Sequence, residues 1–309
     1  MNERNACASC KTLPMPEGFS TAPFGERLKV VFSERGQLCL GLDPHPFLLR
    51  DWGLEDTPHG LREFCLRVIE GAGGTVGIIK PQVAFFERYG SAGYAVLESV
   101  SAQARSSGLL VIADAKRGDV GSTVEAYGAA WLTPGSPLEA DALTLSAYQG
   151  VGSLRQVIDL AVSSGKGVFI LAATSNPESV ETQLAIRDRG RSAGATIAAS
   201  IVNEVQALNS ETGVLPAENA GLGSVGVVIG ATIDMLDYRI ESDLLRFTPI
   251  LAPGFGEQGA MLSDLPDLFG AVAPNVIANV GRAVLRAGPD GFKRSLLEHA
   301  HQLAKAMVT

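Results

Sequence analysis

The chain has 309 residues, of which 46% are hydrophobic and 19% charged, so it can bury a large core. Its net charge of −8, with no stretch dominated by Lys or Arg, argues against a nucleic-acid or membrane surface. Its 4 cysteines make no disulfide framework, and the CxxC pair Cys7 and Cys10 lacks the second pair that a zinc site requires. Without an apolar run of membrane-spanning length or a signal peptide, we expect a cytoplasmic protein.

Apolar runs of strand length alternate with helical patterns along most of the chain. Residues 1–20 are polar, contain prolines and lack periodicity, so we expect a flexible N-terminal tail. The predicted strands lie at residues 38–43, 76–80, 109–114, 140–146, 168–173, 225–229, 249–252 and 276–279. The predicted helices lie at residues 24–35, 61–69, 85–106, 120–131, 154–162, 180–208, 234–245 and 290–306.

The strand pattern predicts an α/β fold. Apolar runs without polar alternation are typical of parallel strands that are buried on both faces. Eight βα units predict a single (β/α)8 TIM barrel over residues 21–309, with the first 20 residues as an N-terminal extension. The alternative is a doubly wound open sheet, but the first strand is not followed by a GxGxxG or GxxxxGK[ST] phosphate loop.

Charged residues gather at the predicted strand ends, which form one rim in such a barrel. The stretch 111–123 begins as an apolar run of strand length and then breaks into charged residues and glycine, with Asp114, Lys116 and Asp119. Asp114 and Lys116 are two residues apart, so an extended strand would point both to the same side. Asp119 follows a glycine and belongs to the loop or the next helix start. Further polar candidates at strand ends are Asp43, Lys80, Ser175, Asn176, Gln258 and Arg282.

The loops after the seventh and eighth predicted strands contain glycines and suggest a phosphate site. Around Gly256 and Gly281, backbone N–H groups can approach a phosphate closely. Arg282 would add a forked, charge-assisted contact and Gln258 a neutral donor. We therefore predict a phosphorylated small-molecule substrate. Glu257 must point away from the phosphate, because its carboxylate would repel the ligand.

The alternating lysines and aspartates suggest proton chemistry without a cofactor. Such groups hold one another ionised, and an ammonium can then act as an acid toward a substrate carbon. Lys80 and Lys116 would repel a divalent cation, which argues against a metal. The candidate residues include no thiol nucleophile, and the sequence has no dinucleotide fingerprint.

Residues 114–119 (DAKRGD), with Thr123 four positions further on, resemble the signature of the orotidine 5'-phosphate decarboxylase family. Residues 80–87 (KPQVAFFE) and 174–177 (TSNP) resemble its longer bacterial branch, type 2. The resemblance covers roughly residues 20–305. It implies a cofactor-free carboxy-lyase (EC 4.1.1.23) that converts orotidine 5'-monophosphate to UMP and CO2 in pyrimidine biosynthesis.

The resemblance also implies roles for individual residues. Lys80, Asp114 and Lys116 of one chain, with Asp119 of its dimer partner, would form a charged tetrad in which Lys116 protonates C6 of the pyrimidine. The active sites of the homodimer would therefore be shared. The implied substrate-binding residues are Asp43, Thr123, Ser175, Asn176, Gly256, Gln258, Gly281 and Arg282. Among these, Asp43 would hold ribose hydroxyls together with Lys80, Ser175 the pyrimidine, and Gln258 and Arg282 the phosphate.

Two other hypotheses remain open at this point. One is a Mg²⁺-dependent sugar-phosphate decarboxylase or epimerase of the same barrel superfamily. Such enzymes share the Asp-x-Lys-x-x-Asp motif but hold the metal with an acid at the end of strand two, where this chain has Lys80. The other is a non-catalytic barrel that binds nucleotide phosphates. That hypothesis predicts a missing catalytic charge, and none is missing from the motif.

Overall fold

Eight parallel strands form a closed barrel in the computed structural model, which describes residues 22–211 and 221–308. The strands pair in chain order, and β8 pairs with β1 to close the barrel. They are β1 Leu38–Leu42, β2 Ile78–Pro81, β3 Leu110–Arg117, β4 Ala142–Leu145, β5 Gly167–Ala173, β6 Val225–Ile229, β7 Ile250–Pro253 and β8 Val276–Val280. The predicted (β/α)8 TIM barrel is confirmed, whereas the predicted tail lies outside the described residues.

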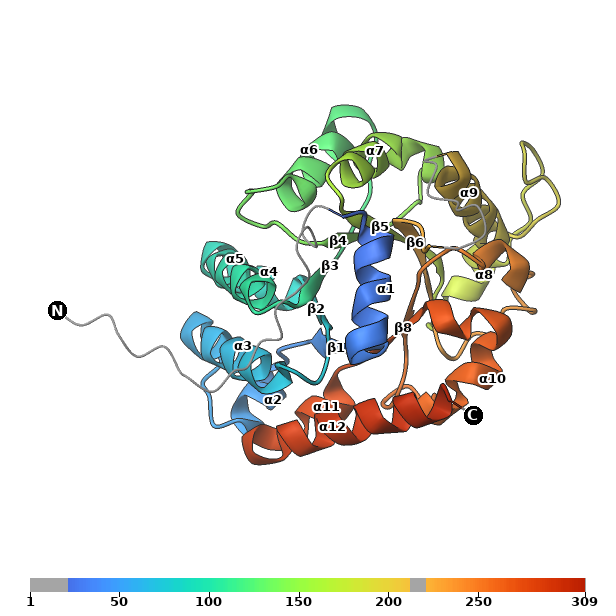
Figure 1. Cartoon of the computed structure of the whole chain (residues 1–309). Helices are drawn as coiled ribbons and strands as arrows, with labels where there is room; N and C mark the ends of the chain where they lie inside the picture. Colours follow the sequence, from blue (N-terminus) through green and yellow to red (C-terminus); the bar gives the residue numbers. More distant parts are fainter. Residues whose placement is uncertain (1–21, 212–220, 309) are drawn as a thin grey trace.

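Helices surround the barrel, as Figure 1 shows. They are α2 Pro46–Asp51, α3 Pro58–Ala72, α4 Ala84–Glu87, α5 Gly90–Ser106, α6 Gly121–Leu132, α7 Arg155–Ser163, α8 Ser179–Gln183, α9 Ile197–Glu211, α10 Leu265–Phe269, α11 Arg282–Leu285 and α12 Gly288–Ala306. Helix α3 shows how the sequence sets a helix start: the Thr57 side chain accepts the Gly60 N–H at 3.2 Å, and Pro58 occupies the first helical position.

Helix α1, Phe24–Arg35, covers the N-terminal end of the barrel (Figure 1). Its Phe24 is fully buried and packs edge-on against Phe169 of β5, with ring centroids 5.9 Å apart. A side chain at Gly167 would not fit, because its Cβ would lie 2.4 Å from the Phe24 ring. The interior of the barrel at this N-terminal end, its floor, is therefore filled with apolar side chains.

The inward positions of the floor determine which residues face the interior near the rim. Cys39, Ile78, Ile112 and Ala142 belong to the apolar cluster around α1. Side chains alternate along a strand, so the residues two positions later face the same interior one step closer to the rim. The inward residues of this next step are Gly41, Lys80, Asp114 and Thr144. The barrel thus brings two of the predicted charged residues to one place.

A second group of charges lies at the N-terminal end of the barrel and was not predicted. Arg27 of α1 donates to Asp141 Oδ1 at 2.6 Å, and the Val111 N–H donates to Asp141 Oδ2 at 2.9 Å. Lys166 donates to Glu139 at 2.7 Å and lies 3.7 Å from Asp141. This network ties α1 to the strands on which it sits.

Three predicted helices differ from the structure. Residues 85–106 form α4 and α5, which are separated near Gly90, where φ is +60°. Residues 180–208 form α8 and α9, with an antiparallel bridge between Ile186 and Thr196 in the intervening segment. In the segment between β6 and β7, all of whose residues are described, there is no α-helix, and the prediction for residues 234–245 was wrong. There the Asp234 carboxylate accepts the Leu236 N–H at 2.8 Å and Arg239 has φ +55°, leaving only a 3-10 turn, η3 Ser242–Leu245.

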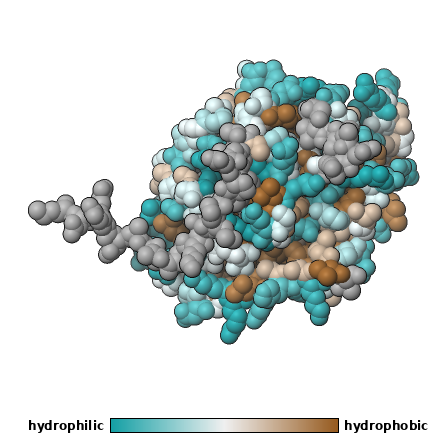
Figure 2. Space-filling model, in the orientation of Figure 1, coloured by the Kyte–Doolittle hydropathy of each residue, from teal (hydrophilic) through white to brown (hydrophobic). Residues whose placement is uncertain are grey.

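The outer surface seen in Figure 2 is mainly hydrophilic, with apolar residues in scattered patches. Within residues 22–211 and 221–308, no helix is both long and apolar enough to cross a membrane.

Candidate active site

The rim of the barrel carries a cluster of two lysines around one aspartate. Lys80 Nζ donates to Asp114 Oδ2 at 2.7 Å, and Lys116 Nζ donates to Asp114 Oδ1 at 2.6 Å. Lys80 is buried, whereas the Lys116 side chain is 44% exposed. The structure therefore brings together three of the four predicted tetrad residues, and it leaves Lys116 accessible from the rim.

The three charges stabilise one another. Burial alone would raise the pKa of Asp114, but Lys80 and Lys116 hold that pKa far below its usual range. Burial alone would lower the pKa of Lys80, but Asp114 and Asp43 raise it well above its usual value. Asp114 and Lys80 therefore remain ionised throughout the neutral pH range, which maintains charge density beside any bound substrate.

Lys116 reaches its position through an irregular backbone. The strand was predicted to end at Asp114 but continues to Arg117, and its register with β4 shifts between Ala113 and Arg117. Lys116 has φ +49°, a left-handed conformation that is uncommon for a residue with a side chain. Asp114 and Lys116 do lie together, but the expectation that a regular extended strand places them on the same side was wrong. Such strain clusters at functional sites.

Asp43 faces the site at the end of β1 with one unused oxygen. Its Oδ1 is buried, and within the described part of the chain it has no hydrogen-bond partner. A Cβ at Gly281 would lie 3.1 Å from Asp43 Oδ2, so the loop after β8 passes close to this carboxylate. Buried polar atoms normally have a partner, and an unpartnered acceptor at a rim is positioned to accept a ligand hydroxyl.

The loop after β7 forms a tight turn at the rim. The Gly259 N–H donates to the Gly256 carbonyl at 3.0 Å, which makes Glu257 and Gln258 the two central residues of the turn. Gly256 and Gly259 have φ +83° and +102°, which favour glycine. Ser175 Oγ, after β5, donates to Gln258 Oε1 at 2.9 Å. This contact leaves the Gln258 NH2 group available to a ligand.

The loop after β8 supplies a cation beside that turn. Gly281 precedes Arg282, and its carbonyl accepts the N–H groups of Val284 and Leu285, each at 3.0 Å. Arg286, one turn further along, donates to Glu257 at 2.7 Å. The acid that stood next to the predicted phosphate donor is therefore bound to a guanidinium.

Comparison with known proteins identifies the family to which this arrangement belongs. The sequence profile described as "Orotidine 5'-phosphate decarboxylase / HUMPS family" matches residues 36–292. The chain belongs to this family. It is 51% identical over 272 residues to an orotidine 5'-phosphate decarboxylase of Streptomyces coelicolor, covering 87% of this chain and 91% of that protein. It is 50% identical over 269 residues to one of Salinispora arenicola, with coverages of 86% and 91%.

Solved structures of the orotidine 5'-phosphate decarboxylase family share the fold. A crystal structure from Streptomyces avermitilis, assigned to orotidine 5'-phosphate decarboxylase, has a TM-score of 0.85 and 46% identity, and the match covers 96% of this chain and 100% of that one. The OMP decarboxylase of Leishmania donovani has a TM-score of 0.73 and 26% identity, with coverages of 93% and 99%.

Two further residues join the charged cluster of this family member. Thr144 of β4 accepts the Lys116 N–H at 2.9 Å and donates to Asp114 Oδ1 at 3.0 Å. Gln82, with its amide turned to satisfy both neighbours, donates to Asp114 Oδ2 at 2.5 Å and accepts from Lys116 Nζ at 3.3 Å. The prediction assigned neither a role. Two sequence features could have pointed to them. Thr144 places a hydroxyl at an inward-facing strand position, and Gln82 lies within the motif at residues 80–87.

Three predicted site residues lie apart from this cluster. Asp119 accepts the N–H of Val120, and within the described residues it contacts none of the three clustered charges. Thr123 is exposed in the first turn of α6. Asn176 accepts from Thr174 Oγ1 at 2.8 Å and donates to Glu178 at 3.0 Å, so its amide stabilises the turn after β5.

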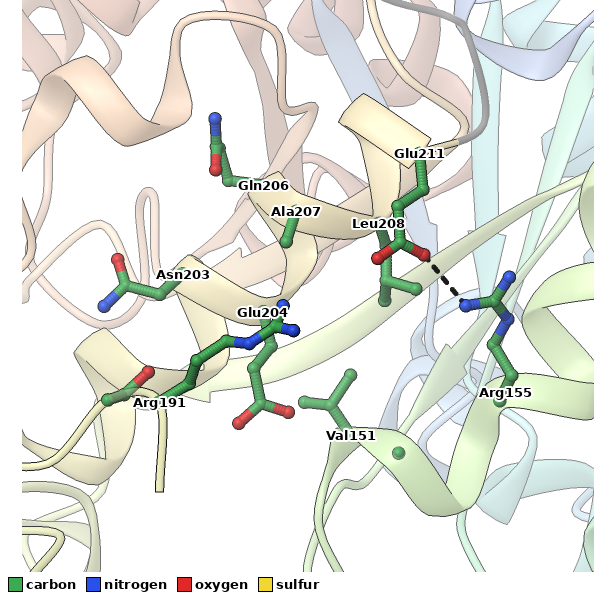
Figure 3. A pocket seen from close by; sticks show the side chains of 11 residues that line it. Val151, Arg155, Arg191, Asn203, Glu204, Gln206, Ala207, Leu208 and Glu211 are labelled. Carbon is green, nitrogen blue, oxygen red and sulfur yellow. Dashed lines mark hydrogen bonds and ion pairs between the residues drawn. The ribbon is translucent and has the colours of Figure 1, made fainter. Parts of the chain in front are cut away.

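A cavity of about 540 Å³ lies elsewhere, between α9 and the segment that leads into α7 (Figure 3). The ion pair between Arg155 and Glu211, at 3.0 Å, lies at its wall. None of the predicted site residues lines it. In the part of the chain that the structure describes, no group of three or more His, Cys, Asp or Glu side chains is placed to hold a metal ion. Cys7 and Cys10 lie outside that part.

Proposed function

We propose that the chain decarboxylates orotidine 5'-monophosphate to UMP and CO2, as a carboxy-lyase of pyrimidine biosynthesis. The observation that carries the proposal is the Lys80–Asp114–Lys116 cluster at the rim of the barrel, in which the Lys116 side chain is 44% exposed. Relatives about half identical over most of the chain are named for this activity.

The reaction needs an acid at the carbon that loses CO2, and Lys116 supplies it. The C6–carboxylate bond breaks, its electron pair stays on C6, and CO2 departs. A Lys116 N–H proton then moves to C6, and Lys116 regains a proton from solvent. Asp114, 2.6 Å from Lys116 Nζ, holds the ammonium in place. No metal or organic cofactor enters this sequence of steps.

The remaining rim residues hold the substrate. Asp43 accepts ribose hydroxyls through its unused Oδ1, and Lys80 donates to them. Ser175 contacts the pyrimidine, and the Ser175–Gln258 hydrogen bond connects that end of the site with the phosphate end. Binding energy from the remote phosphate can thus organise the groups around the reacting carbon. The proposed phosphate contacts come from Gly256, Gln258, Gly281 and Arg282, and Asn176 shapes the loop beside them.

We propose further that two chains share their active sites. Asp119 and Thr123 stand at the start of α6, away from their own charged cluster. Val120, next to Asp119, is 54% exposed. Tyr148 is 88% exposed and belongs to the loop after β4, which packs against Gly118 through Ser146. Such exposed apolar side chains suit a face covered by a partner. In a symmetric homodimer, Asp119 and Thr123 of each chain would then complete the partner's site.

Hybrid dimers test this sharing. Lys116→Ala and Asp119→Ala are each expected to be inactive. A hybrid of the two has one site with both native residues, so random exchange at equal amounts should restore about a quarter of wild-type specific activity. The measurement is activity after mixing, with subunit exchange followed by a tag on one chain. If exchange is complete and activity stays absent, the sites are not shared.

The absorbance of orotidine 5'-monophosphate, followed with purified protein, tests the activity itself. Loss of substrate absorbance with equal rates in buffer and in EDTA is expected. A rate that EDTA abolishes would favour the Mg²⁺-dependent sugar-phosphate hypothesis, although Lys80 stands where that hypothesis places an acidic ligand. Binding of UMP without turnover would favour the non-catalytic barrel. The cytoplasmic location stays a prediction.

A further inference from the structure

Side chains from two other segments bind the turn at residues 256–259. The sequence predicted no role for the second of these contacts, which involves Glu257. Gln258 is bound by Ser175, whereas Glu257 is bound by Arg286 of the segment after α11. We propose that Glu257 and Arg286 form a latch that positions the phosphate loop before the substrate binds. Both are positioning residues in this inference, which rests on the proposed phosphate site.

The geometry of the turn gives the latch its effect. Glu257 and Gln258 are adjacent central residues of one β-turn, so fixing one side chain restricts the orientation of the peptide that carries the other. The flanking Gly256 and Gly259 both have positive φ and contribute no side chain that would stiffen the turn. Without an external anchor, part of the phosphate binding energy would be spent on ordering this loop.

The latch also links the phosphate loop with the loop after β1. The Arg286 guanidinium lies 5.4 Å from the centre of the Phe47 ring, and Phe47 stacks on His45 with 5.2 Å between ring centroids. His45 follows Asp43 by two residues, and its N–H donates to the Asp43 carbonyl at 2.7 Å. One arginine therefore connects the proposed phosphate-binding turn with the segment that carries the proposed ribose-binding carboxylate.

Charge makes the proposal testable, because two explanations predict opposite signs. Glu257 carries a negative charge next to a proposed dianion site. If Glu257 acted only through its field, Glu257→Gln would tighten phosphate binding, Arg286→Gln would weaken it, and the two effects would offset in the double variant. If the two residues act as a latch, each single change weakens binding, and the double variant is no worse than either single variant.

The experiment measures KM and kcat for orotidine 5'-monophosphate, and Kd for UMP, with Glu257→Gln, Arg286→Gln, Arg286→Lys and the double variant. The pair is partly exposed, with Arg286 51% and Glu257 25% accessible. We therefore expect each Gln variant to raise KM and Kd about two- to five-fold. The value of kcat should stay within about two-fold, because the latch is remote from C6. Arg286→Lys should raise KM and Kd less than Arg286→Gln, because a lysine can still pair with Glu257.

A matched control comes from α3, where Glu63 and Arg67 form an ion pair of 2.8 Å with 38% and 45% exposure. Glu63→Gln should leave KM and Kd unchanged. Tighter UMP binding in Glu257→Gln, or additive effects in the double variant, would overturn the latch. If Arg286→Gln does not fold, Glu257→Gln and Arg286→Lys still decide the question. Failure of the proposed function would appear separately, as a wild-type protein that binds UMP without turnover.

Discussion

The two ends of the barrel carry ion clusters of similar composition and different completeness. At the N-terminal end, each oxygen of Asp141 and Glu139 has a donor: Arg27 and the Val111 N–H for Asp141, and Lys166, Arg105 and the Gly135 N–H for Glu139. At the rim, Asp114 is equally well bound, but one buried oxygen of Asp43 has no partner among residues 22–211 and 221–308, and Lys116 stays exposed.

The difference separates a structural network from a reactive one. Buried charges are tolerated when hydrogen bonds and opposite charges compensate them, and such a network then holds elements in register. A rim cluster with an unused acceptor and an accessible ammonium still has capacity for a ligand. Composition alone therefore does not reveal function: basic and acidic side chains meet at both ends, but among the described residues the buried carboxylate oxygen without a partner, Asp43 Oδ1, lies at the rim.

The largest expected effect on stability is at the N-terminal network. Arg27→Met removes the cation 2.6 Å from Asp141 Oδ1, and within the described part of the chain the buried carboxylate keeps only the Val111 N–H and the more distant Lys166, at 3.7 Å. We expect the free energy of unfolding to fall by about 3–5 kcal/mol, with kcat of the folded protein nearly unchanged. Urea unfolding and kinetics on the same preparations measure both quantities. The matched control is Arg67→Met in an exposed pair, with an expected loss of about 1 kcal/mol or less. Equal losses in the two variants would contradict the comparison.

A smaller effect on stability, together with a loss of activity, is expected at Thr144. Thr144→Val keeps the shape of the side chain but removes an acceptor for the Lys116 N–H and a donor to Asp114. The expected destabilisation is about 1–3 kcal/mol, and kcat should fall about ten-fold because Lys116 is positioned through this contact. Circular dichroism melts and steady-state kinetics test this. Unchanged kcat would show that the irregular backbone at Lys116 does not depend on Thr144.

The smallest effect concerns acid stability. Burial alone would raise the pKa of Glu139, but hydrogen bonds from Lys166 and the Gly135 N–H lower it from 4.5 to about 2. Between these values the unfolded chain binds more protons than the folded protein, so this contribution to stability is lost as pH falls from about 5 toward 2. Urea midpoints at several pH values should therefore decline more steeply for the wild type than for Glu139→Gln. The exposed-site variant Glu63→Gln should keep the wild-type slope, and parallel curves for the wild type and Glu139→Gln would contradict the assignment.

Strand positions and the charges at their ends were predictable from the sequence, because apolar runs of parallel strands and charged strand ends are local patterns. Lys80, Asp114 and Lys116 therefore converge as expected. The contacts of Thr144 and Gln82 were not predictable, since they depend on the irregular backbone of β3 around Lys116 and on the neighbouring strands. The Arg27–Asp141 pair joins residues 114 positions apart and leaves no local signal. The helix predicted at 234–245 failed because a side-chain turn at Asp234 competes with helical hydrogen bonds.

We infer that the rim cluster performs the chemistry. Lys116→Ala tests this most directly, when its kcat and its Kd for UMP are both measured. Decarboxylation should fall by at least about 10³-fold in this variant, as expected for loss of the proton donor. UMP should still bind within about ten-fold of wild type, because its phosphate and ribose contacts remain. The thermal midpoint should change little, since Lys116 is exposed. Retention of most of the turnover by Lys116→Ala would contradict the assignment of the acid and, with it, the proposed mechanism.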